Sequence, residues 1–484
     1  MNPSLASLIC FCGIGGLFYL DRDRTVRISS ALWLPTIYLW ILGSRAASVW
    51  LGISSPAGVN IQLSGSPLDA AIFGLLLLGA ILVLVRRGKR VVPFLTRNWL
   101  ILAYFLYCLI SVAWSFHPDV AFKRWIKAIG DPAMCLVILT DRQPVEALKR
   151  LISRVGFVLF PTSLLLIKYY PRLGRGYGPG GEPSNTGVTT DKNMLGVMLF
   201  VVSLFTLWHV ITLLKGKPHP SRKRHLWAQG VLLAFGVVLL EMAHSATSIA
   251  CFILGAGLIF ASGLRSIRGR PAMVHVLCLS IFFTGGLTLL LGGSADVAHA
   301  LGRQSNLSGR TDIWAALIPA AGNPIVGTGF ESFWISPNVV GFAHTLKAEG
   351  WWHPEGLNEA HDGYLEVYLN LGLIGVGLIA AILINAYRRA AAGFQRNPSI
   401  SGLMLAYIVC SAFYCITEAG FRSLSLMWIF LLLATISANG IPAGIFGDKR
   451  KQTLRLGSIV LRRAGRLSAG SQKEMSRTAQ RKRA

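Results

Sequence analysis

The stretch NEAHDGYLEVYLNLGLIGVGLIAAIL, residues 358–383, begins with charged and polar side chains and continues as an apolar run long enough to cross a bilayer. Similar runs of about 20 apolar residues recur along the whole chain. The sequence of 484 residues is 53% hydrophobic and only 14% charged. This pattern predicts an all-α polytopic membrane protein with about 12 or 13 transmembrane helices.

The predicted spans are separated by short polar connections, with one long exception. They lie near residues 4–20, 32–51, 69–85, 99–114, 129–141, 152–170, 193–214, 226–242, 246–263, 272–292, 362–385, 402–418 and 424–440. We therefore expect about ten N-terminal spans in 1–292, a large loop in 293–360, about three C-terminal spans in 361–440 and a basic, disordered tail in 441–484.

The cysteines give no sign of a metal site. Eight are scattered along the chain without a C-x-x-C pair or a Cys/His ligand spacing, and four lie inside apolar runs: Cys108, Cys251, Cys278 and Cys410. We interpret them as packing residues. The N-terminal sequence MNPSLASLIC lacks the basic stretch and the cleavage site of a secretory signal, so we expect it to remain in the mature protein.

Charge sorts the connections into two groups. Alternate connections are basic, at 86–90, 215–225, 265–270, 387–396 and from 449 onward. Basic connections stay in the cytoplasm, so we expect 171–192, 243–246, 293–360 and 418–423 to face outward. The net charge of +26 is then mostly orientation signal plus the basic tail. For that tail we favour contact with anionic lipid over nucleic acid.

The long outward loop is the most promising extramembrane feature, because the chain has no Walker-type phosphate loop and no dinucleotide-binding glycine motif. Within it, DIWAALIPAAG (312–322) spaces Ile313, Leu317 and Ala320 or Ala321 at helical intervals. The spacing predicts a short amphipathic helix lying on the membrane surface.

Outward-facing cations need an explanation other than orientation. Arg172 and Arg175 follow a predicted span, and Arg303 and Arg310 lie in the long loop. A guanidinium matches phosphate oxygens in geometry and stays charged. For Arg172 and Arg303, headgroup contact or a loop salt bridge explains the charge as well as a ligand does, whereas for Arg175 and Arg310 we favour a ligand.

Two further outward segments carry polar residues at the start of predicted spans. In TTDKNMLG (189–196), Asp191 is interpreted as a helix cap, and Lys192 stands where free amide groups can meet an anion. In HSATS (244–248), turn chemistry accounts for the hydroxyls better than a functional role does.

His361 is the leading candidate for catalysis. On a helix it shares one face with Leu365, Tyr368, Gly372 and Gly375, whose glycines would allow close helix packing. A neutral imidazole near its ordinary pKa is a suitable general base for a hydroxyl. A lone interfacial histidine is more often structural, and Asn358 or Glu359 would serve as helix caps. The nearby Trp351 and Trp352 offer surfaces on which sugars stack.

Taken together, several motifs resemble those of the bacterial O-antigen ligase and polysaccharide polymerase superfamily, above all its exopolysaccharide polymerase branch. The resemblance covers roughly residues 95–440 and rests on GRGYG (174–178), TTDKNMLG (189–196), HSATS (244–248), SGRTDIW (308–314), NPIVGTGFESFW (323–334) and EAHDGYLEVYLNLGLIG (359–375). The chain departs from the family pattern at Asp362, where asparagine is expected, and at Asp191, where histidine is expected.

The resemblance implies a glycosyltransferase of the bacterial inner membrane. Such an enzyme moves saccharide units from undecaprenyl pyrophosphate to a sugar hydroxyl on the periplasmic face, with no cofactor and no metal, and with inversion at the anomeric carbon. Its partners would be the lipid-linked donor, a glycan acceptor, the bilayer and a chain-length regulator, and no nucleic acid. The implied roles are His361 as catalytic residue, Arg310, Arg175 and Lys192 for pyrophosphate, and Asn193, Trp351, Trp352 and Glu359 for the saccharide or acceptor.

Two alternatives stay open. A ligase that joins the finished glycan to lipid A core shares the donor chemistry with a polymerase. A transporter or flippase of lipid-linked saccharide belongs to another class, and it should show paired repeats or interrupted helices with ionisable residues near the midplane. The candidate residues for that reading lie close to predicted span ends: Arg45, Lys168, Glu241 and Glu418.

Overall fold

The computed structural model describes most of the chain up to residue 440. The described residues are 1–440 without 24–25, 54–64, 178–182, 217–219, 265–272, 274, 277, 281–307, 340–341 and 343–357. The predicted span at 272–292 and the basic tail therefore fall largely or wholly outside the described residues, as do Trp351, Trp352 and Arg303.

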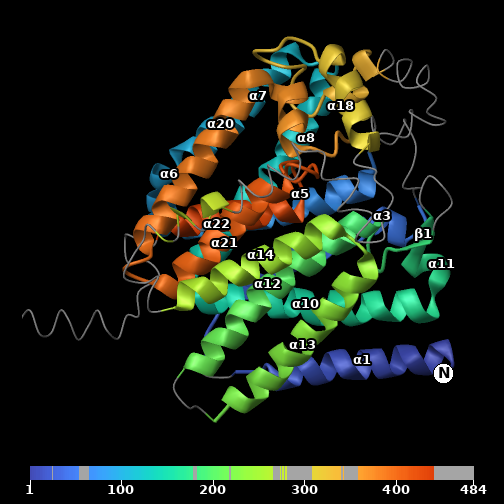
Figure 1. Ribbon diagram of the computed structural model, residues 1–484, viewed down its shortest axis with the longest axis vertical. Helices are drawn as coiled ribbons and strands as arrows, with labels where there is room; N and C mark the ends of the chain where they lie inside the picture. Colours follow the sequence, from blue (N-terminus) through green and yellow to red (C-terminus); the bar gives the residue numbers. More distant parts are fainter. Residues whose placement is uncertain are drawn as a thin grey trace, which may run out of the picture.

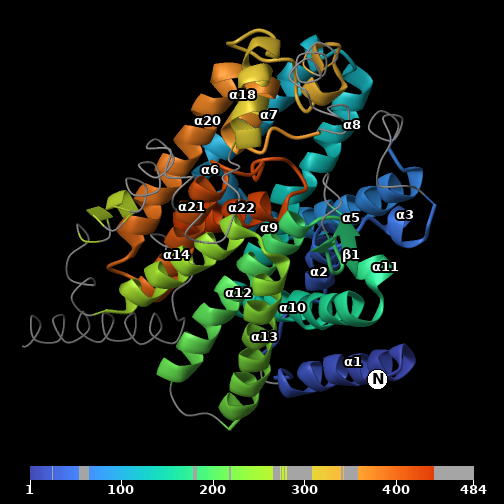
Figure 2. The same ribbon diagram turned by 45° about the vertical axis from the view of Figure 1, so that its right-hand side comes forward.

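The described chain is a bundle of helices (Figure 1; Figure 2 shows it turned by 45°), as an all-α polytopic membrane protein requires. Seven helices are long and apolar enough to cross a membrane: α1 (Pro3–Leu20), α5 (Pro67–Arg86), α10 (Pro144–Tyr169), α12 (Lys192–Lys215), α13 (Arg222–Ala243), α14 (Ala246–Gly263) and α20 (Gly363–Gly393). The count rises to eight if α6 (Gly88–Arg97) and α7 (Trp99–Ser111), which meet at 84°, form one span. Shorter apolar helices are η1 (Ser30–Leu32) with α2 (Trp33–Leu42), α21 (Pro398–Tyr414) and α22 (Leu426–Gly440).

Smaller elements connect these helices. They are α3 (Ala47–Trp50), η2 (Val112–Trp114), α8 (Pro118–Ala128), α9 (Gly130–Leu139), α11 (Pro171–Gly174), α18 (Ser308–Ala320), η3 (Phe333–Ile335) and the antiparallel strands β1 (Arg175–Tyr177) and β2 (Pro183–Asn185). The strands form a two-stranded hairpin in which Arg175 lies opposite Asn185.

The centre of the bundle is α22, whose residues are all buried. It packs against α20, α21, α9 and α12. By contrast, only 11% of the apolar window of α1, and 11% of that of α5, is buried. Apolar side chains that remain this exposed are expected where a helix faces lipid, so α1 and α5 form the rim of the bundle.

The two ends of the bundle differ in composition. At one end, which we call the basic end, Asp21 lies 3.1 Å from His225 and Asn439 donates to Asn98 at 2.6 Å. The helix termini there are joined by the basic connections. At the opposite end, which we call the site end, the Arg45 amide donates to the Val188 carbonyl at 3.1 Å. Figure 1 shows α6 on the left, at the basic end, and α11, β1 and α3 on the right.

The longest helix, α20, is interrupted. Gly372 has φ 62° and ψ −164°, a conformation that is essentially restricted to glycine. The interruption frees backbone groups that the segment 323–329 satisfies: the Thr328 and Gly329 amides donate to Leu369 and Asn370 at 3.1 and 2.9 Å, and the Leu373 amide donates to Pro324 at 2.8 Å. Gly372 was expected to let a neighbouring helix pack closely. It does allow a close approach, but the segment that packs against it is the loop backbone at Ile325 and not a helix.

The helix predicted at 312–322 exists as the second half of α18, but its apolar face is not directed at a membrane surface. Ile313 and Leu317 pack in a separate small core with Phe333, Phe342 and Leu369. The described part of the long loop is thus anchored on the first turns of α20, so the loop carries its own hydrophobic support.

Replacing Gly372 with alanine should destabilise the protein by about 2 kcal/mol or more, because a side chain there is strained and its Cβ would lie 2.3 Å from the Ile325 carbonyl carbon. The matched control is Gly377→Ala on the same helix, where an added Cβ meets nothing within 4 Å. Thermal melting of both variants in detergent measures the difference. Equal melting temperatures would show that the break is not fixed by Gly372.

Candidate functional site

The backbone around His361 is fixed on both sides. The amide of Ala360 donates to Glu366 Oε2 at 3.0 Å, and its carbonyl accepts from Trp314 Nε1 at 2.9 Å. On the other side, Asp362 Oδ1 caps α20 by accepting from the Tyr364 and Leu365 amides at 2.7 and 2.9 Å. His361 therefore precedes the helix, and the expectation that it lies on a helical face was wrong.

The constraint is visible in the backbone conformation of His361. Its φ is 48°, in the left-handed region that most side chains avoid but histidine enters more often than most. A residue held in this region between two anchored neighbours cannot swing freely, so the imidazole is presented from a rigid support.

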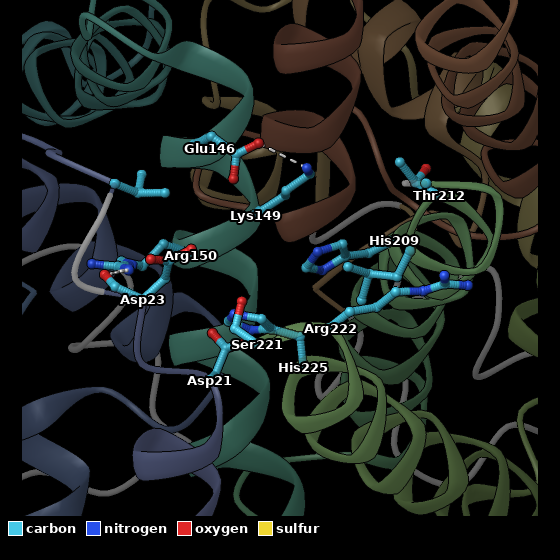
Figure 3. Close-up of a pocket in the computed structure, with 13 residues that line it drawn as sticks. Asp21, Asp23, Glu146, Lys149, Arg150, His209, Thr212, Ser221, Arg222 and His225 are labelled. Carbon is cyan, nitrogen blue, oxygen red and sulfur yellow. Dashed lines mark hydrogen bonds and ion pairs between the residues drawn. The ribbon is translucent and has the colours of Figure 1, made fainter. Parts of the chain in front are cut away.

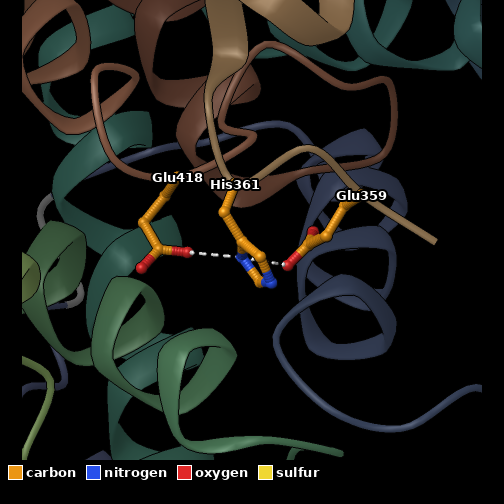
Figure 4. Close-up of side chains that lie close together, drawn as sticks. All are labelled: Glu359, His361 and Glu418. Carbon is orange, nitrogen blue, oxygen red and sulfur yellow. Dashed lines mark ion pairs between the residues drawn. The ribbon is translucent and has the colours of Figure 1, made fainter. Parts of the chain in front are cut away.

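Two carboxylates face the same imidazole nitrogen (Figure 4). His361 Nδ1 lies 2.9 Å from Glu359 Oε1 and 3.6 Å from Glu418 Oε2. Neither contact meets hydrogen-bond angles among the described residues, so the arrangement is an ion pair rather than an aligned hydrogen bond. Burial lowers the pKa of His361, but the two carboxylates more than offset it and raise the pKa to about 9.

This pKa changes one premise of the sequence interpretation. A histidine with a pKa of about 9 carries two protons at neutral pH, so it is not the neutral imidazole that the sequence suggested. The residue remains the centre of the cluster, and the carboxylates make its imidazole a stronger base once it loses a proton.

The motifs at 189–196 and 244–248 meet the cluster through Glu418. Asn193 Nδ2 donates to Glu418 Oε2 at 3.4 Å, and Ser245 Oγ donates to Asn193 Oδ1 at 3.5 Å. Thr247 and Thr417 share a hydrogen bond at 3.0 Å. Segments far apart in the sequence thus converge on one polar site at the site end.

The two departures from the family pattern have the same structural role. Asp191 Oδ1 caps α12 by accepting from the Asn193 and Met194 amides, both at 2.8 Å, as Asp362 caps α20. Burial raises the pKa of Asp191, and the charges of Glu359 and Glu418 raise it further. At each position the aspartate begins a helix whose first residues belong to the site.

Sequence reasoning missed two cations at this end. Arg422 Nη1 lies 3.6 Å from Glu359 Oε2 and donates to the Asn358 carbonyl at 3.2 Å. Arg124 of α8 donates to the Glu331 carbonyl. Arg422 lies in the segment 418–423 that was expected to face outward, so the argument applied to Arg172 and Arg310 would have found it. Arg422 brings a guanidinium directly to the carboxylate that holds His361.

The remaining predicted cations are not joined to this cluster by a contact in the described part of the chain. Arg175 is exposed on β1 and donates to the Ile167 carbonyl at 3.1 Å. Lys192 is exposed at the first residue of α12, directly before Asn193. Arg310 belongs to α18, and its side chain lies outside the described residues.

A metal ion is a second use for the same side chains. Ligand atoms of Glu359, His361 and Glu418 all lie within 4.8 Å of one another, as three ligands of one ion would. An ion bound there would have to displace the proton from His361, whose pKa the two carboxylates raise, so its binding would strengthen as the pH rises. The same three side chains can therefore hold either a proton on the imidazole or a cation.

Removing one carboxylate should lower the pKa of His361. In Glu418→Gln we expect a value about 1 unit or more below the wild-type value near 9, because one of the two negative charges facing Nδ1 is lost. Histidine side-chain NMR over a pH titration measures it. The control is Glu241→Gln, an exposed glutamate at the end of α13. An unchanged pKa in Glu418→Gln would mean that Glu418 does not act on the ring.

Comparison with known proteins agrees with the motifs. Residues 229–380 match the O-antigen ligase family. Over 323 residues the chain is 27% identical to the exopolysaccharide production protein ExoQ of Rhizobium meliloti (strain 1021), which covers 63% of this chain and 68% of that protein. The matched family segment contains Ser245, Glu359 and His361 of the site. Both comparisons support the resemblance of this chain to O-antigen ligases and exopolysaccharide production proteins.

Proposed function

We propose that this enzyme transfers saccharide units from an undecaprenyl-pyrophosphate-linked donor to a sugar hydroxyl and so polymerises the repeat units of an exopolysaccharide or O-antigen. The observation that carries the proposal is the cluster of Glu359, His361 and Glu418, a histidine held between two carboxylates with Arg422 beside it. It lies at the end of a bundle that is built for a membrane, where a lipid-linked donor can arrive from the bilayer.

In this reaction the acceptor oxygen attacks the anomeric carbon of the donor sugar, and the bond from that carbon to the pyrophosphate oxygen breaks. The electron pair leaves with pyrophosphate, and the hydroxyl proton goes to His361. We assign this proton to Nε2, because Glu359 and Glu418 both contact Nδ1 and stabilise a proton there. Direct displacement inverts the anomeric configuration and needs no metal.

Cations at the site end would stabilise the charge that develops on the leaving pyrophosphate. Arg422 is joined to the cluster through Glu359. We retain Arg310, Arg175 and Lys192 as further pyrophosphate ligands, and Asn193, Glu359, Trp351 and Trp352 as contacts to the saccharide or acceptor. Among these, Asn193 is joined to the cluster through Glu418.

For orientation we propose that the site end faces the periplasm and the basic end the cytoplasm, in a bacterial inner membrane. The basic connections at the ends of α5, α12 and α20 support this assignment. The tail at 441–484 would then be cytoplasmic. A separate chain-length regulator would act with the enzyme as a partner.

The transporter alternative is weakened by where the polar residues lie. α20 is interrupted, as helices of transporters often are, but the break is filled by the backbone of 323–329. Glu418 belongs to the His361 cluster, and Arg45 donates to the Thr189 carbonyl at 3.1 Å; both lie at the site end. Both candidate residues thus lie at one end of the bundle rather than near the midplane, which suits an enzyme better than a transporter. A ligase acting on lipid A core would use the same cluster with another acceptor.

His361→Ala should lower the transfer rate by a factor of 10² to 10⁴, the usual contribution of a positioned base. Cells carrying it should accumulate single lipid-linked repeat units and make little polymer, measured by glycan electrophoresis at matched protein levels. His225→Ala is the control, since His225 also contacts a carboxylate, Asp21 at 3.1 Å, but lies at the basic end. Undiminished polymer in His361→Ala would remove this residue from the mechanism.

The pH dependence separates two roles of His361. If it is the base, kcat/KM should rise about tenfold per pH unit up to about 9, because only the fraction that has lost a proton is active. A rate that is constant and then falls above about 9 would instead show that the imidazolium is the active form. The assay uses purified enzyme with a synthetic lipid-linked donor.

In the same assay, an added metal chelator should leave the transfer rate unchanged. Loss of activity on adding the chelator would contradict the metal-independent mechanism.

A further inference from the structure

A large basic cavity lies at the end of the bundle opposite to His361. Its volume is about 820 Å³, and its lining includes one acid, Asp141, and six cations: Arg27, Arg86, Arg87, Lys89, Arg90 and Arg142. The other lining residues come from the start of η1, the end of α5 and the start of α6. Such an excess of positive charge in one concavity favours an anionic ligand.

The acid of the cavity is already engaged. Asp141 Oδ2 lies 3.5 Å from Arg87 Nη2 and accepts from the Ser29 amide at 3.3 Å. Arg87 in turn donates to the Val137 carbonyl at 2.7 Å and to Thr140 Oγ1 at 3.2 Å. Arg87 and Asp141 thus form the fixed wall of the cavity. The other five cations have no carboxylate partner within ion-pair distance in the described part of the chain.

A neighbouring cavity at the same end shows the difference (Figure 3). Its volume is about 390 Å³, and it is lined by acids and bases that pair with each other. Lys149 lies 2.8 Å from Glu146, and His225 lies 3.1 Å from Asp21. Bases in the smaller cavity are thus paired with acids. The larger cavity differs because its cations greatly outnumber its one acid.

The surroundings of α6 indicate which class of molecule carries the anionic group. α6 is a short helix that lies at 84° to α7. Its inner side is anchored by the buried Val91 and Phe94 and by the hydrogen bond between Asn98 and Asn439. Its flanks expose Val85 at 74% and Trp99 at 63%. A basic concavity next to exposed apolar side chains fits an amphiphile with a charged head.

We propose that this cavity binds the phosphate headgroup of an anionic phospholipid in the leaflet at the basic end, with the acyl chains along α5 and α6. Arg86, Lys89 and Arg142 face the phosphate, and Arg90 completes the site beside Thr140, to whose carbonyl it donates at 3.5 Å. The proposal does not rest on the transfer reaction, since it concerns the opposite end of the bundle.

The test uses the full-length protein purified in a neutral detergent, with phosphatidylglycerol and phosphatidylcholine as probes and native mass spectrometry as the readout. Arg86→Gln/Arg142→Gln should weaken phosphatidylglycerol binding at least tenfold. The matched control is Arg388→Gln/Arg389→Gln, which removes two exposed arginines from another basic connection at the same end. Melting temperatures of both variants confirm folding.

Selective loss in Arg86→Gln/Arg142→Gln, with little phosphatidylcholine bound by any form, supports the proposal. Equal binding by the two variants would overturn it, since the effect would then be one of general surface charge. Millimolar inorganic pyrophosphate is the second arm: if it displaces phosphatidylglycerol completely, the cavity is a site for soluble phosphate and the lipid assignment fails.

Discussion

The interruption of α20 at Gly372 is the constraint on which the site depends. A continuous helix would satisfy its own backbone and leave no acceptors for the loop. Because the helix breaks, the segment 323–329 bonds along it, and the following residues place Trp334 Nε1 2.7 Å from Glu366 Oε1. Glu366 then holds the amide of Ala360, the residue before His361. A backbone break inside the bundle thereby positions a side chain at its surface.

The cluster around His361 is assembled from three parts of the chain that are each held by helix starts or helix connections. Asp362 begins α20, Asp191 begins α12, and Glu418 lies between α21 and α22. The Gly363 amide donates to the Cys415 carbonyl at 2.7 Å. This hydrogen bond fixes the connection between α21 and α22 to the first residue of α20. Burial destabilises the charged imidazole, but the two carboxylates stabilise it more. The ion pair is therefore stable, and the pKa of His361 is raised.

Much of this architecture could be predicted from the sequence, because apolar runs and basic connections report directly on the bilayer. Asn193, Glu359 and His361 were named from the sequence as site residues. In the structure Glu359 and Glu418 contact His361, and Asn193 donates to Glu418. Local patterns could not show that α20 breaks, since Gly372 falls in an apolar run with no proline. They also could not predict the charge of His361, because that charge depends on Glu418. Glu418 lies 57 positions further along the chain and reaches His361 only in the folded protein. Arg422 was within reach of the same reasoning and was overlooked.

The burial of α22 has a consequence for how the protein is made. A membrane chain inserts in order of synthesis, and α22 is the last helix that the structure describes, yet it occupies the middle of the bundle. The earlier helices must therefore enter the bilayer and wait with their inner faces turned to lipid or to insertion factors. The last helix that the structure describes therefore completes the packing of helices that were inserted before it.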